Sequence, residues 1–113
     1  MGVTVLSDKA VEKSTYVVTV AFADEDGNAV TPDSISWTLS DTDGNVVNSR
    51  SDVSITVPAA SNDIVLSGDD LAIPRPSMLR RRMTIEAVYD SDAGSDLPFK
   101  GEIEFEVTPL TNV

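Results

Sequence analysis

A seven-residue phrase occurs twice in this chain, each time directly after a stretch of alternating apolar and polar residues. The first copy, at residues 24–30, reads DEDGNAV, and the second, at residues 41–47, reads DTDGNVV. Both contain Asp-Gly-Asn, and Gly and Asn adopt the positive φ of tight turns at low energetic cost. Alternating segments that end in such turns are typical of short β-strands. The repeat therefore predicts an all-β fold.

The alternation itself indicates where the strands lie. Five segments carry it, at residues 16–22, 34–39, 53–57, 79–89 and 99–107, and shorter apolar stretches lie at 3–6, 46–47 and 63–66. A period of two places every second side chain on the same face of a sheet. The side chains expected to face the core are Tyr16, Val18, Val20, Phe22, Ile35, Trp37, Leu39, Met83, Ile85, Ala87, Tyr89, Ile103, Phe105 and Val107.

Two segments interrupt the alternation. Residues 67–79 contain two prolines and an acidic pair, and we expect a crossover loop with one helical turn near residues 69–73. Residues 90–98 are acidic and are expected to form the loop that joins the last two strands.

The last two strands allow a specific pairing prediction. One antiparallel register puts apolar residues together on the inner face and opposite charges together on the outer face, which is how register is specified. The expected pairs are Tyr89 with Phe99, Ile85 with Ile103, Met83 with Phe105, Arg82 with Glu106 and Glu86 with Glu102, with Lys100 diagonal to Glu86.

Composition excludes several classes of function. The chain has 113 residues, with 19 Asp and Glu against 8 Lys and Arg, for a formal net charge of −11. Nucleic acids and anionic membranes bind clustered cations, so neither is an expected partner. The chain has no Cys and no His, which removes thiol chemistry and the commonest general base and transition-metal ligand. We expect no catalytic site, no cofactor and no enzymatic activity.

The length fits one domain. We expect a core sandwich over residues 15–107, an edge strand and connection over 1–14, and a tail over 108–113. The first residues are too short and too weakly apolar for a signal peptide.

With about seven or eight short strands, one Trp on an early strand and a long crossover before the last hairpin, residues 15–107 resemble immunoglobulin-like and fibronectin-type-III-like domains. Trp37 occupies a position where such sandwiches often keep a core aromatic residue, and Tyr89 ends the penultimate strand. The Cys pair of antibody domains and a tyrosine corner are missing. The chain is most similar to the small cysteine-free modules of tailed-bacteriophage virion proteins and bacterial surface proteins. The resemblance implies a single immunoglobulin-like, two-sheet antiparallel sandwich.

The expected topology sorts the loops to two ends. The turn at 23–33 and the loop at 90–98 share an acidic end, where calcium could bind through oxygen ligands. The calcium candidates are Asp24, Asp26, Asp90 and Asp92, but we expect these residues chiefly to form turns and keep the loops solvated. The turn at 40–45 and the crossover at 67–79 share the other end.

Half of the cations lie between residues 75 and 82. Arg75, Arg80 and Arg81 are therefore candidates for docking a protein partner. The alternative is intramolecular, with Arg82 paired to Glu106 and Arg80 and Arg81 balancing nearby acids. Strict alternation points Arg81 inward, or places it beyond the core at the end of the sheet.

The resemblance implies a non-enzymatic structural or protein-interaction module whose partners are other protein subunits. The function expected is that of a bacteriophage virion component, such as a head, decoration, head–tail or tail accessory protein, in the virion or in the cytoplasm of the producing cell. The alternative is a calcium-dependent immunoglobulin-like domain of a bacterial surface adhesin.

Overall fold

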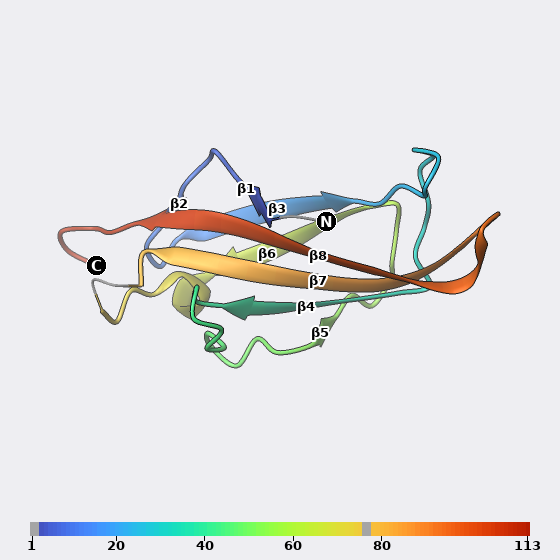
Figure 1. Ribbon diagram of the computed structural model, residues 1–113. Coiled ribbons are helices and arrows are strands. Elements are labelled where there is room, and N and C mark those ends of the chain that lie inside the picture. Colours follow the sequence, from blue (N-terminus) through green and yellow to red (C-terminus); the bar gives the residue numbers. More distant parts are fainter. Residues whose placement is uncertain (1–2, 76–77) are drawn as a thin grey trace.

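The computed structural model describes residues 3–75 and 78–113, and the regular secondary structure of these residues is almost entirely β-strand (Figure 1). Eight strands and one 3₁₀ helix are found within these ranges. They are β1 (Val3–Val5), β2 (Ala10–Val11), β3 (Thr15–Ala21), β4 (Ser34–Ser40), β5 (Val53–Ser54), β6 (Ser61–Ser67), η1 (Gly68–Leu71), β7 (Arg80–Ser91) and β8 (Gly94–Thr108). The all-β prediction is confirmed, and so is the helical turn in the crossover. The part of that crossover at residues 76–77 lies outside the described residues.

The strands form two sheets. The larger, curled sheet has the order β1-β8-β7-β4-β5, with β2 also paired to β8, and the smaller sheet contains β3 and β6. Strands β1 and β2 pair with β8 in parallel, so the expectation of a purely antiparallel sandwich is wrong. The cause is the path of the N-terminal segment, which runs along the edge of β8 in the same direction as β8 before the chain turns into β3. Within the described residues, no helix is long and apolar enough to span a membrane.

The alternation predicted the core well. Eleven of the fourteen side chains expected to face inward are buried, namely Val18, Val20, Phe22, Ile35, Trp37, Leu39, Met83, Ile85, Ala87, Phe105 and Val107. Tyr16, Tyr89 and Ile103 are only partly buried. Aromatic rings join the two sheets, since the centroids of Tyr16 and Phe105 lie 4.7 Å apart and those of Phe22 and Phe99 lie 5.1 Å apart.

The repeated phrase forms the same turn twice. In each copy one carboxylate oxygen of the first Asp accepts the backbone N–H groups of the residues two and four positions later, at 2.9–3.0 Å. The glycine of each turn needs positive φ, which is 84° at Gly27 and 92° at Gly44. The sequence repeat is therefore a structural repeat, in which Asp holds the loop and Gly allows the reversal.

The last hairpin is longer than predicted. Strand β7 continues to Ser91 and β8 begins at Gly94, so residues expected to form an acidic loop are mostly paired. The register differs from the prediction by two residues: Met83 faces Ile103 and Ile85 faces Gly101. A shift of two residues keeps every side chain on its face, which is why the core is as predicted although the pairs are not.

The segment at residues 53–57 is mostly not a strand. Only β5 pairs, with Trp37 and Ser36 of β4, and Val57 is 78% exposed. Asp52 has a φ of 49°, which breaks the extended chain just before β5, and Pro58 follows. The alternation predicted a strand of five residues, and the structure has a strand of two, β5.

Candidate functional site

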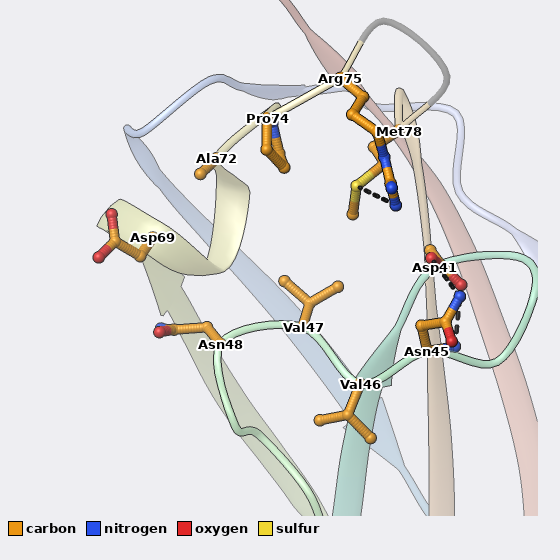
Figure 2. A pocket seen from close by; sticks show the side chains of 10 residues that line it. All are labelled: Asp41, Asn45, Val46, Val47, Asn48, Asp69, Ala72, Pro74, Arg75 and Met78. Carbon is orange, nitrogen blue, oxygen red and sulfur yellow. Dashed lines mark hydrogen bonds between the residues drawn. The ribbon is translucent and has the colours of Figure 1, made fainter.

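A cleft of about 450 Å³ opens at the crossover end of the molecule, as Figure 2 shows. One wall is the segment that follows β4, and the other is the crossover between η1 and β7. The predicted meeting of the second Asp-Gly-Asn turn with the crossover is therefore confirmed. The lining residues are Asp41, Asn45, Val46, Val47, Asn48, Asp69, Ala72, Pro74, Arg75 and Met78.

Apolar side chains make up the inside of this crossover-end cleft. Val47 points from one wall toward Ala72 and Pro74 on the other (Figure 2). Met78 closes one side, and the neighbouring Val46 is half exposed. Such a lining favours contact with apolar groups, and the few polar groups at its rim would orient them.

Arg75 is the exposed cation at the rim. Its Nη2 donates to the Met78 sulfur at 3.5 Å. In the described part of the chain, every other Lys or Arg except the buried Arg81 lies within 4.0 Å of a carboxylate, namely Lys9, Lys13, Arg50, Arg80, Arg82 and Lys100. A guanidinium without a carboxylate partner is unusual in a molecule with so many acids, and it is available to an acidic group from outside.

Asp41 marks the opposite rim and stays ionised. The backbone N–H of Asn45, its side-chain amide and the backbone N–H of Asp43 donate to this carboxylate. These hydrogen bonds, with the positive charge of Arg75, hold the pKa of Asp41 below its ordinary value. The cleft therefore combines the exposed cation Arg75 with two acids, the nearly buried Asp41 and the exposed Asp69.

Arg81 holds the crossover wall of the cleft in place from the buried side of that wall. Its side chain is 0% exposed. Its guanidinium donates to the backbone carbonyls of Met78 at 2.7 Å, Asp70 at 3.3 Å, and Ala72. Burial lowers its pKa. The prediction that Arg81 could dock a partner is wrong, because alternation does point it inward and the crossover covers it.

Asp70 holds the other wall of the cleft, the segment that follows β4. The sequence did not identify this residue as part of a site. Its carboxylate is 1% exposed and accepts from Arg50 Nε and Asn48 Nδ2, both at 2.9 Å, and from the Ser67 N–H at 3.1 Å. Burial opposes its ionisation, but these hydrogen bonds outweigh burial and lower its pKa. The only sequence signal is the spacing Ser67-x-x-Asp70, which is typical of a capping arrangement at the start of a helical turn.

Arg80 and Arg82 lie on the outer face of β7 and are tied to β8. Arg80 contacts Glu104 at 2.8 Å and Glu106 at 3.3 Å, while Arg82 contacts Glu104 at 2.9 Å. The predicted pairing of Arg82 with Glu106 is wrong because of the two-residue register shift. Hydrogen bonds from Arg82 and Arg80 lower the pKa of Glu104. Arg80 is exposed but already paired, so Arg75 is the docking candidate best placed at a cleft.

The acidic end gathers carboxylates as predicted, in two groups. Asp33, Asp90 and Asp96 have carboxylate oxygens within 4.8 Å of one another, and so do Asp24, Glu25 and Asp26. The calcium candidates Asp24 and Asp26 fall in one group and Asp90 in the other, while Asp92 belongs to neither. One oxygen of Asp24 already accepts two backbone N–H groups.

Repulsion at the acidic end leads to a pH prediction. The charge of Asp90, followed by burial, raises the pKa of Asp33. A raised folded-state pKa means that stability falls as pH rises from the ordinary Asp value through the raised one. Asp90→Asn is expected to remove this fall and to raise the urea midpoint at neutral pH. Asp92→Asn, outside both groups, is the control, and an equal gain there would contradict the repulsion argument.

The cleft combines an apolar lining with a cation and anions, and the chain contains neither His nor Cys. The groups that it offers are apolar side chains and one exposed guanidinium. Comparison of the chain with protein-family models, with curated proteins and with solved structures found no match.

Proposed function

We propose that this protein is a non-enzymatic structural module of the immunoglobulin-like kind, which docks onto another protein subunit as a component of a tailed-bacteriophage virion. The observation that carries the proposal is Arg75, an exposed cation with no carboxylate within 4.0 Å among the described residues, at the rim of an apolar cleft in a molecule of net charge −11. The two-sheet fold with a buried Trp37 supports the immunoglobulin-like assignment.

The geometry of the cleft suggests what the partner presents. An acidic side chain next to a small aliphatic residue would place its carboxylate on Arg75 and its apolar group beside Val47 and Met78. Arg presents its donors in a rigid fork that matches a carboxylate. Asp41 on the facing rim would disfavour a second acid on the same segment, so the partner contact is expected to be selective rather than generally acidic.

Particle incorporation tests the proposal. Particles assembled in producing cells are purified by density gradient, and the copies of this chain per particle are counted by quantitative mass spectrometry. We expect a fixed copy number for the native chain and a loss of about tenfold or more for Arg75→Ala, since truncating one partner of a charge pair that a complex buries commonly costs at least that factor.

Lys100→Ala is the matched control, because it removes one exposed cation and gives the same net charge. Lys100 lies on the outer face of β8, away from the cleft, and pairs with Glu86 at 3.4 Å. Absence of the native chain from particles would refute the virion role. Equal incorporation of the two variants would refute docking through Arg75.

The alternative function, a calcium-dependent adhesin domain, concerns the acidic end instead. The urea denaturation that compares native protein with Asp90→Asn separates it when it is repeated in calcium and in chelator. A calcium-dependent rise in midpoint that Asp90→Asn abolishes would favour the adhesin, because a ligand bound to the native state alone must raise stability. An unchanged midpoint would remove that alternative.

A further inference from the structure

Strand β3 has one hydrogen-bonded neighbour and one open edge. Hydrogen bonds from the Phe22 N–H to the Ala60 carbonyl (2.8 Å) and from the Gly68 N–H to the Ser14 carbonyl (3.0 Å) lie at the two ends of the β3–β6 pair. In an antiparallel pair only alternate residues bond across, so the even-numbered residues of β3 face β6. The N–H and C=O groups of the odd-numbered ones point to the open side, and the described residues provide no partner for them there.

This open edge has none of the features that usually protect one. Natural edge strands carry charges, prolines, bulges or a covering segment. Strand β3 reads TYVVTVA, without a charge, a Gly or a Pro. The opposite edge of the same sheet differs, because Asp63 lies at the centre of β6.

The solvent-facing side of this two-stranded sheet carries an apolar side chain on each strand at one pair of facing positions. Val17 and Val65 face each other across the two strands and are 50% and 58% exposed. Next to this pair, Thr19 donates to Asp63, the one charged side chain of the two strands, at 2.8 Å. The rest of the molecule is crowded with acids, so this sheet is the surface on which two copies would repel least.

We propose that β3 pairs antiparallel with β3 of a second copy of this chain, giving a continuous four-stranded sheet in the order β6-β3-β3-β6. The odd-numbered residues of each β3 would then bond across the two-fold axis. Val17 of both copies would lie on the same face beside Val65. The two-fold pairing uses the same edge of each copy, so it closes on itself and does not extend into a fibre.

Charge decides between antiparallel and parallel pairing. Lys13 lies just before β3, and the acidic group of Asp24, Glu25 and Asp26 lies just after it. Antiparallel pairing puts the two acidic turns at opposite ends of the shared edge, each beside the end that carries Lys13, which also contacts Asp69 of its own copy at 3.5 Å. Parallel pairing would place the two acidic turns together. A second copy therefore complements this edge in hydrogen bonding, and the antiparallel direction avoids the repulsion between the two acidic turns.

The dimer is expected to be weak at low salt and stronger at high salt. One strand pair is a small interface, at the lower end of the specific range, and each copy carries a net charge of −11. Screening reduces the long-range repulsion more than it reduces backbone hydrogen bonding. The proposal does not depend on the virion role, and it can hold or fail whichever way the incorporation experiment turns out.

Sedimentation equilibrium over a range of concentrations tests the dimer. We expect the average mass to rise from that of the monomer toward twice that value, with tighter association in added NaCl. Val17→Lys is expected to weaken association about tenfold or more, because each copy would place a charged side chain at the shared edge in place of an apolar one. Val65→Lys is the control, since it places the same residue on the same face but on the neighbouring strand. Equal effects of the two variants would overturn the proposal.

Amide hydrogen exchange of the unmodified protein gives a second readout. At low concentration the even-numbered amides of β3 should be protected and the odd-numbered ones should exchange fast. At high concentration the amides of Thr15, Val17 and Thr19 should become protected, while those of Ser61 and Asp63 on the open edge of β6 stay fast. A monomer at all concentrations, or protection on β6 instead, would refute pairing through β3.

Discussion

Replacing Arg81 with methionine is expected to lower the free energy of unfolding by about 3 kcal/mol, because each buried carbonyl left without a donor costs about 1–3 kcal/mol. Methionine keeps most of the apolar stem but offers nothing to the carbonyls of Asp70, Ala72 and Met78. Two of these residues line the cleft, so the variant should also loosen the crossover wall. Urea denaturation followed by Trp37 fluorescence measures the loss.

Arg80→Met is the matched control for this prediction. It removes the same side chain one position earlier, where the guanidinium is half exposed and pairs with Glu104 and Glu106. Arg82 keeps its own 2.9 Å contact with Glu104 when Arg80 is replaced, and an ion pair of a half-exposed guanidinium contributes about 0–1 kcal/mol, so the control should change stability little. Arg81→Lys should fall between, since a single ammonium cannot reproduce the fork. Similar losses for Arg80→Met and Arg81→Met would show that Arg81 does not hold the crossover.

The sequence was sufficient to predict which side chains face the core but not how the strands align. Alternation identifies faces, and both registers of the last hairpin bury the same residues. Charge could have distinguished the two registers. The predicted register sets Glu86 opposite Glu102, which is repulsive, whereas the observed register sets Glu86 opposite Lys100. A tight reversal at residues 92–93 completes that register, and no Asp-Gly-Asn phrase marked it in advance.

The candidate site was predictable only in part, for a related reason. Arg75 could be singled out because cations are scarce in this chain, and the turn repeat placed Asp41 near the crossover. The two residues that hold the walls of the cleft, Arg81 and Asp70, could not be identified from the sequence. Arg81 bonds to backbone carbonyls, which have no signature in the sequence. Asp70 bonds to Asn48 and Arg50, whose positions depend on a loop where Asn48 and Ser49 both adopt positive φ, at 53° and 57°.

Replacing Asp70 with alanine is expected to lower the free energy of unfolding by about 3 kcal/mol, because the buried carboxylate accepts three hydrogen bonds and each such bond to a charged group contributes about 1.5–3 kcal/mol before the cost of burying the charge. The carboxylate holds Asn48 and Arg50 on either side of a loop with two unfavourable φ angles, and its own backbone carbonyl accepts from Arg81. Loss of Asp70 therefore releases both walls of the cleft. Asp70→Asn should cost less, since the amide keeps one acceptor oxygen but places a donor against Asn48, Arg50 or the Ser67 N–H.

The pH dependence separates the charge of Asp70 from its packing. Its pKa is lowered on folding, so the stabilisation from ionisation is fully present above the ordinary Asp value of 3.8 and is lost as pH falls through the folded-state pKa. The stability difference between native protein and Asp70→Asn should therefore shrink as the solution is acidified into this range. Asp69→Asn is the control, because Asp69 is an exposed neighbour in η1 whose contact with Lys13 is 3.5 Å long. A difference that stays constant with pH would mean that Asp70 acts through its shape and hydrogen bonds, with its charge contributing nothing to the cleft.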